Sequence, residues 1–133
     1  MAVQLSVAVR NARLDSVEST IGTAPTLEIR TGAQPADCVA ADSGTLLASM
    51  TLPSDWMNAA SGGTKTIAGT WQDLSADAPG TAAHFRIKQG ATCGMQGNVT
   101  ATGGGGDIEL SSVSITAGQS VTITGFTLTD ANA

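Results

Sequence analysis

Apolar and polar residues alternate through most of the last third of the chain, which is typical of β-strands that bury one face. Val121 and Ile123 alternate with hydroxyl residues. Beyond Gly125 the alternation continues one position out of step, at Phe126 and Leu128. A one-residue slip at a glycine indicates a β-bulge, so we expect all four apolar side chains to face one core.

The preceding stretch, Asp107–Ile115, alternates in the same way and has its own slip at Ser111-Ser112. Its apolar positions are Ile108, Leu110, Val113 and Ile115. The connection Thr116–Gln119 is short enough for an antiparallel hairpin. We therefore predict that these last two long stretches pair with each other.

Shorter alternating stretches come earlier in the chain and complete a mainly β pattern. We expect strands at Thr26–Thr31, Gly44–Leu52, Thr64–Trp71, Thr81–Lys88 and around Gln96–Ala101. Short strands with regular turn residues between them are typical of a sandwich or a barrel. The long connections Gly32–Ser43 and Ser54–Gly63 favour Greek-key or jelly-roll crossings over a plain meander. We predict one domain over residues 1–133, a jelly-roll-like antiparallel β-sandwich with its strands within residues 26–130 and one N-terminal α-helix.

The alternation also predicts which side chains face inward. In the strand that ends at Leu52, one face carries Leu46, Ala48, Met50 and Leu52. In the strand that ends at Lys88, Ala83, Phe85 and Ile87 should face the core, and His84, Arg86 and Lys88 should face outward. We therefore expect His84 to be exposed or at an interface.

Helical spacing replaces alternation near the N-terminus. Apolar residues recur along one side of a helix over about residues 6–20, where Ser6 can cap the start and Gly22 the end. The basic residues lie in its first half and the acidic residues in its second half, opposite to what the helix dipole favours. We therefore expect its apolar stripe to dock on the chain's own sheets or on a partner. The stripe consists of Val7, Leu14, Val17 and Ile21.

Trp56 and Met57 follow Pro53 in a loop or a single helical turn. Such a pair either plugs the end of the sandwich or anchors an interface, because Trp is enriched at binding hot spots. Together with the four residues of the helix stripe, Trp56 and Met57 form the contact surface that we expect for a partner.

Composition narrows the choice of partners. Only 13% of the 133 residues are charged, and the net charge is −5. Part of the surface is therefore covered by neighbours, or it is simply rich in Thr and Ser. The six basic residues form no cluster, which argues against a nucleic-acid partner. No apolar run approaches the roughly 18 residues of a membrane span, and the first residues lack the features of a signal peptide.

Several residues could carry chemistry, but each has a simpler explanation. The tract Gly103–Gly106 is followed by Asp107 and a strand, not by the Lys-Ser/Thr and helix of a phosphate-binding loop, so we expect a bent hairpin turn. The sequence has no nucleophile elbow such as Gly-x-Ser-x-Gly, so we do not expect His84 to act as the general base of a catalytic triad. Asp37 and Asp42 do not have the spacing of an EF-hand and should solvate their loop.

Cys38 and Cys93, with one histidine in the chain, fall short of the four ligands of a structural zinc site. They could form a disulfide if their segments abut, but we expect reduced, semi-buried thiols, as in a cytoplasmic protein. We predict no catalytic residue, no cofactor and no metal site.

Three blocks of the chain resemble a group of small structural proteins encoded in the morphogenesis regions of tailed bacteriophages: Leu5–Gly32, Gly44–Trp71 and Gly97–Ala133. Together with the segment around Gly80–Ile87 they cover most of the chain. Lys88-Gln89-Gly90 departs from the group, in which turns rich in Asp, Ser and Gly are more usual. The resemblance implies a virion component, assembled in the host cytoplasm, and it brings no catalytic motif.

This resemblance and the composition favour a capsid decoration or cement protein. Such a protein would bind between major capsid subunits and associate with itself as a dimer or trimer. The alternatives are a neck, tail or fibre-associated component, and a host-surface module that binds or hydrolyses carbohydrate. The last class usually needs aromatic platforms or paired carboxylates in a cleft, whereas this chain has two Trp, two Phe and no Tyr.

Overall fold

The computed structural model describes residues 3–132, which form one helix followed by eleven short strands. Helix α1 spans Val7–Ile21, and the Ser6 side chain accepts a hydrogen bond from the amide of Val9 at its start. The chain leaves the helix at Gly22, as the sequence predicts. The strands are β1 (Thr26–Arg30), β2 (Leu46–Thr51), β3 (Thr64–Thr66), β4 (Trp71–Asp73), β5 (Gly80–Thr81), β6 (His84–Gln89), β7 (Thr92–Ala101), β8 (Ile108–Leu110), β9 (Ser114–Ile115), β10 (Val121–Ile123) and β11 (Thr127–Thr129). A mainly β fold with one N-terminal helix is thus confirmed.

The largest sheet has five strands in the order β2-β1-β6-β7-β8. Its first four strands are antiparallel to their neighbours, but β8 runs parallel to β7, with Val99 opposite Ile108. The sheet is therefore mixed, and the expectation of a wholly antiparallel fold is wrong. The tract Gly103–Gly106 is likewise not a hairpin turn. Gly103 and Gly105 have φ angles of 87° and 80°, which let this short loop fold back so that β8 starts beside β7 in the same direction.

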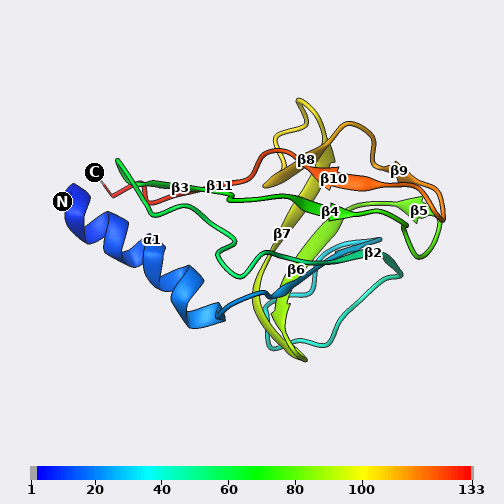
Figure 1. Cartoon of the computed structure of the whole chain (residues 1–133), viewed down its shortest axis with the longest axis horizontal. Helices are drawn as coiled ribbons and strands as arrows, with labels where there is room; N and C mark the ends of the chain where they lie inside the picture. Colours follow the sequence, from blue (N-terminus) through cyan, green and yellow to red (C-terminus); the bar gives the residue numbers. More distant parts are fainter. Residues whose placement is uncertain (1–2, 133) are drawn as a thin grey trace.

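Three two-stranded sheets complete the structure: β4 with β10, β3 with β11, and β5 with β9. Strand β4 also lies against β2, and β10 lies against β8, so this pair spans the open side of the five-stranded sheet (Figure 1). The arrangement is a curled half-barrel with small accessory sheets, not a clear jelly-roll sandwich.

The hairpin predicted between the last two long stretches is wrong. The turn itself exists, because the amide of Gln119 donates to the carbonyl of Thr116 at 3.1 Å. The strands on its two sides, however, do not pair with each other. Strand β9 pairs with β5, and β10 pairs with β4. The segment between β4 and β5 runs beside both arms and takes up their hydrogen bonds, for example between Ala76 and Gln119 at 2.8 Å.

At the predicted slip, Gly125, the chain changes the strand with which it pairs. Strand β10 before it pairs with β4, and β11 after it pairs with β3. Three residues, 124–126, separate β10 from β11, whereas four, 67–70, separate β3 from β4 on the opposite side. The expected continuous strand Thr64–Trp71 is therefore two strands. Phe126 is buried with Val121 and Ile123, and Leu128 packs partly buried against the same core, so the predicted common face is confirmed.

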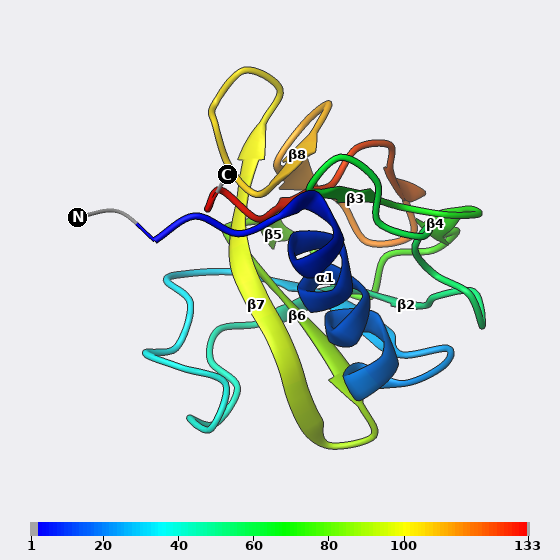
Figure 2. The same ribbon diagram turned by 90° about the vertical axis from the view of Figure 1, so that its left-hand side faces the viewer.

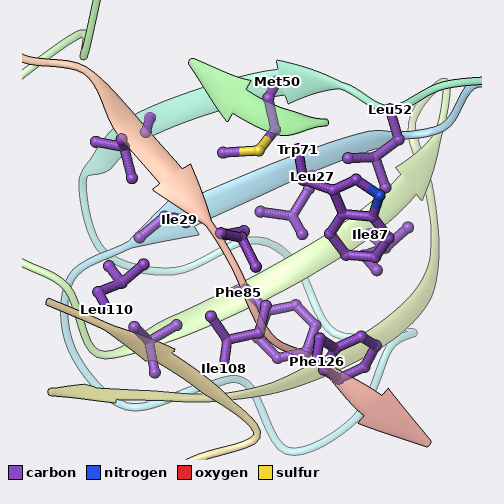
Figure 3. Packing of buried hydrophobic residues seen from close by; sticks show 14 of the residues in the cluster. Leu27, Ile29, Met50, Leu52, Trp71, Phe85, Ile87, Ile108, Leu110 and Phe126 are labelled. Carbon is purple, nitrogen blue, oxygen red and sulfur yellow. The ribbon is translucent and has the colours of Figure 1, made fainter. Parts of the chain in front are cut away.

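The core fills the concave side of the half-barrel. Phe85 contacts Phe126 edge-to-face with ring centroids 5.6 Å apart, and Trp71 lies 6.0 Å from Phe126 (Figure 3). Gly97 of β7 makes room for Phe85, because a Cβ there would lie 2.7 Å from the ring. Other members are Leu27, Ile29, Ala48, Met50, Leu52, Ile87, Ile108 and Leu110. Leu46 is only partly buried and Leu47 is buried in its place, because the β1–β2 register shifts there.

The other face of the five-stranded sheet is covered as well. His84 and Arg86 are 0% and 2% exposed, so the prediction that they face solvent is wrong. They do project away from the core, as alternation requires, but the long connection between β1 and β2, residues 31–45, folds over them. This segment, cyan in Figure 1, lies on the opposite side of the sheet from β10. We call it the covering loop.

Helix α1 lies across one end of the half-barrel, alongside β3 (Figure 2). Its C-terminal end is attached to the sheet through Gln89 of β6, whose side-chain amide donates to the carbonyls of Ile21 and Thr23 at 3.2 and 2.9 Å. Ile21 itself packs against Gly94 of β7, where a Cβ would lie 2.6 Å from the Ile21 side chain. The helix therefore docks on its own chain.

Candidate functional site

The structure buries most of the residues that the sequence suggested as a contact surface. Trp56 and Met57 lie in the core, and Leu14 and Ile21 are also buried. These four side chains have almost no surface left for a partner, because the chain's own elements cover it. Val17 packs partly buried against the core, and only Val7, at 47% exposure, is open to solvent.

Trp56 closes the end of the half-barrel beneath the helix. Its indole nitrogen donates to the carbonyl of Gly22 at 2.9 Å, and its ring lies 5.9 Å from that of Trp71. The next residue is held from the helix side, because the amide of Met57 donates to a carboxylate oxygen of Glu18 at 3.0 Å. Of the two roles that the sequence left open for this pair, the structure shows the plug.

A buried lysine joins the helix to β3. The Lys65 ammonium donates to Asp15 at 2.7 Å and to the carbonyl of Asn58 at 2.9 Å, and it pairs with Glu18 at 3.0 Å. Burial opposes the charge on Lys65, but its carboxylate partners outweigh burial and raise its pKa. The hydrogen bond from Lys65 lowers the pKa of Asp15. No pattern in the sequence indicates this cluster, because Lys65 simply alternates with polar neighbours.

The same residues line a cleft of about 600 Å³ between the helix and the segment that follows Pro53. Asp55 lies close to Glu18 at its rim, and this acidic neighbour raises the pKa of Asp55. The cleft holds three carboxylates and one ammonium, and the ammonium is fully engaged by its own neighbours. Its polar groups thus serve to dock the helix.

A second charged cluster holds the covering loop on the sheet. The Arg86 guanidinium binds Asp42 at 2.6 Å through Nη1, and through Nη2 it binds the carbonyls of Asp37 and Ala40, both at 3.0 Å. Lys88 binds the second oxygen of Asp42, also at 2.6 Å. These cations, Lys88 first and then Arg86, lower the pKa of Asp42 to about 2.

Neither acidic residue of the covering loop is arranged for calcium. Asp42 is engaged by Lys88, Arg86 and, at 3.4 Å, Arg30. Asp37 accepts the amides of Val39 and Ala40 within its own turn, both at 2.9 Å. Throughout residues 3–132, no group of three or more His, Cys, Asp or Glu side chains could hold a metal ion.

His84 has a structural position under the covering loop. Its Nδ1 lies 2.8 Å from the carbonyl of Gly32, which makes Nδ1 the protonated nitrogen. Its Nε2 is buried and has no hydrogen-bond partner within the described part of the chain. The sequence could not show this burial, because the loop that causes it is distant from β6.

The glycine tract is occupied by the chain's own acidic groups. The amides of Gly103 and Gly105 donate to the Glu109 carboxylate at 3.3 and 3.0 Å. Asp107 accepts the amide of Asn98 at 3.0 Å, which ties the end of the loop to β7. Amide donors of the kind that a phosphate would need are thus already satisfied by the chain itself.

No protein-family model matches the chain, and neither the curated proteins nor the solved structures include one that is significantly similar. Within residues 3–132 no helix is long and apolar enough to cross a membrane.

Proposed function

We propose that this chain is a structural protein of a bacteriophage virion, and specifically a capsid decoration protein that binds between major capsid subunits. The observation that carries the proposal is the resemblance of Leu5–Gly32, Gly44–Trp71 and Gly97–Ala133 to small morphogenesis-region proteins. These blocks contain the helix, the plug beneath it and the β8–β11 side of the half-barrel. The three blocks thus contain α1, β1, β2, β3 and β8 to β11, whereas β6 and half of β7, in the largest sheet, lie outside them.

The charged side chains of this protein pair mainly with one another. This supports a contact with the partner that is mainly apolar and backbone-mediated. The basic side chains are few, and all of them are engaged internally. Arg10 binds the carbonyls of Leu5 and Asp130, and the other five form ion pairs. Those five are Arg13, Arg30, Lys65, Arg86 and Lys88. In the described part of the chain no basic side chain is left to attract an acidic partner, and the charged fraction of the chain is low, so we expect binding to depend weakly on salt.

The contact surface proposed here is the start of α1. Val7 is the residue of the predicted stripe that stays exposed, and Val3 and Val9 beside it in sequence are 69% and 46% exposed. The same surface is a candidate for self-association into a symmetric dimer or trimer. Sedimentation of the purified chain measures that association.

The test is to strip this protein from purified particles and re-add it at increasing concentration. We expect half-occupancy to shift less than about tenfold between roughly 50 and 300 mM salt. Val7→Asp should weaken re-binding by about tenfold or more, because it places a charge in the apolar contact. Val39→Asp is the matched control, since Val39 is an exposed valine in the covering loop.

Two results would contradict this proposal. A larger salt shift would mean that charge dominates the contact. Loss of binding in Val39→Asp but not in Val7→Asp would place the contact on the covering loop. A neck or tail component remains the second candidate, and the copy number per particle separates it from a decoration protein.

A further inference from the structure

The two cysteines lie on the same side of the five-stranded sheet. Cys93 of β7 is the register partner of Lys88 of β6, after a shift that leaves Gly94 unpaired. Residues paired across a sheet share a face. Lys88 projects to the outer face, where its ammonium binds Asp42 of the covering loop at 2.6 Å. Cys93 therefore also faces the covering loop.

Cys38 is held over that same face by Arg86. The Nη2 atom of Arg86 binds the carbonyls of Asp37 and Ala40, both at 3.0 Å, and these residues bracket Cys38 in the chain. The side-chain amide of Gln96, on β7, donates a further hydrogen bond to the covering loop just before Cys38, at the carbonyl of Pro35, 2.8 Å away. The Cys38 segment is thus attached to both β6 and β7.

We infer that Cys38 and Cys93 are a redox pair whose oxidation forms a disulfide that closes the covering loop covalently onto β7. Both side chains are free thiols and only partly buried, so a small oxidant can reach them. The two thiols are neighbours, because Cys38 is one of the groups that raise the pKa of Cys93. This inference does not depend on the proposed virion role.

We expect the two thiols to react one after the other, in a defined order. Burial, together with the neighbouring Cys38, raises the pKa of Cys93 to about 11, which leaves very little of its thiolate at neutral pH. Because the thiolate is the nucleophile, we expect the first attack to come from Cys38, in the covering loop. With oxidised glutathione as the oxidant, the Cys38 sulfur attacks one glutathione sulfur, and one glutathione thiolate leaves.

The second step closes the pair. The Cys93 sulfur attacks the Cys38 sulfur of the mixed disulfide, and the second glutathione leaves as a thiolate. In sum, two protein thiols are oxidised to one disulfide and one oxidised glutathione is reduced to two glutathione thiols, which take up the two protons. Closure needs only a small movement, because the covering loop already lies on the sheet.

The test equilibrates the reduced full-length chain in glutathione redox buffers and follows its mass and free thiols. We expect both thiols to disappear together with a loss of about 2 Da, and the covering loop to favour closure about a hundredfold over the same chain in denaturant. Peptide mapping without reduction should join the Cys38 and Cys93 peptides. Stable glutathione adducts on both cysteines, or equal closure in native and denatured chain, would overturn the inference.

Single variants test the order of the steps. In Cys93→Ser, Cys38 should retain a stable glutathione adduct of about 305 Da, because the resolving thiol is absent. In Cys38→Ser, Cys93 should react at least about tenfold more slowly. Arg86→Lys keeps the charge but loses the fork that holds both carbonyls, and it should reduce the native preference for closure. Faster reaction of Cys93 than of Cys38 would refute the proposed order.

Discussion

The indole nitrogen of Trp56 donates a hydrogen bond to the carbonyl of Gly22 at 2.9 Å, where the helix ends. A helix leaves its last carbonyls without intrahelical donors, and Trp56 satisfies one just beyond this end. The tryptophan that could have anchored a partner thus fixes the helix to the half-barrel.

Trp56→Phe should lower the free energy of unfolding by about 1–3 kcal/mol, because it keeps an aromatic ring but removes the indole donor and some volume. Chemical denaturation measures this change. Met57→Leu, which conserves volume at the neighbouring buried position, is the control and should cost under about 1.5 kcal/mol. An equal or smaller loss for Trp56→Phe than for the control would show that the Trp56–Gly22 contact is unimportant.

Lys65→Met should destabilise the fold by about 2–4 kcal/mol. The substitution preserves length and packing but leaves Asp15 and Glu18 without their cation, beside Asp55. Because Asp15 is half exposed, the loss should lie below that for a fully buried pair. Thermal or chemical unfolding gives the value.

Glu18→Gln in the Lys65→Met background provides the comparison. It removes one of the uncompensated carboxylates and should restore part of the lost stability. If the two changes are simply additive, the charges of this cluster do not interact as the structure indicates.

The contribution of Asp42 to the stability of the fold should be lost at acidic pH, within a defined pH range. Asp42 has a pKa of about 2, below its ordinary value of 3.8, so its stabilisation is complete above about pH 4 and is lost as the pH falls through 2. The side chain is 28% exposed, and after solvent screening we expect about 1–2 kcal/mol.

The measurement compares wild type with Asp42→Asn by denaturation over this pH range. The stability gap between them should be present at neutral pH and shrink as the pH approaches 2, because protonated Asp42 and Asn are both neutral. A gap that stays constant with pH would mean that the ion pairs with Lys88 and Arg86 do not stabilise the covering loop.

Phe126→Ala should cost about 3–5 kcal/mol, because the ring is buried between Phe85 and Trp71. Leu128→Ala, on the same face but only partly buried, should cost clearly less. Chemical denaturation of both variants tests the register through Gly125. A loss below about 1 kcal/mol for Phe126→Ala would contradict it.

Local patterns in the sequence predicted the elements well. The helix caps at Ser6 and Gly22 are visible in the sequence, because capping depends on neighbouring residues only. The slip at Gly125 likewise predicted that Phe126 would join Val121 in the core, since alternation fixes the face of each strand residue.

The pairing of strands that are distant in the chain could not be predicted from the sequence. The arms of the Thr116–Gln119 turn pair with β5 and β4, and nothing in their own residues specifies these partners. The burial of Arg86 and Lys65 was also missed. Both side chains are covered by segments distant in the chain, and their charges are balanced only once the fold brings Asp42 and Asp15 to them.

Most of the predicted contact surface is buried within the chain itself, for a related reason. A helical apolar stripe shows that α1 must dock but not on what, and here Leu14 and Ile21 dock on the chain itself. Much of the docking is polar, through Lys65 and through Arg13 with Asp130 at 3.2 Å. An apolar pattern alone cannot reveal such contacts.

The most direct test of the virion role is to count this polypeptide against the major capsid protein in purified phage particles, by quantitative mass spectrometry. We predict on the order of hundreds of copies per particle, as expected for a protein that repeats with the symmetry of the capsid shell. About a dozen copies would contradict the decoration role and favour a neck component, and absence from purified particles would contradict the proposed function altogether.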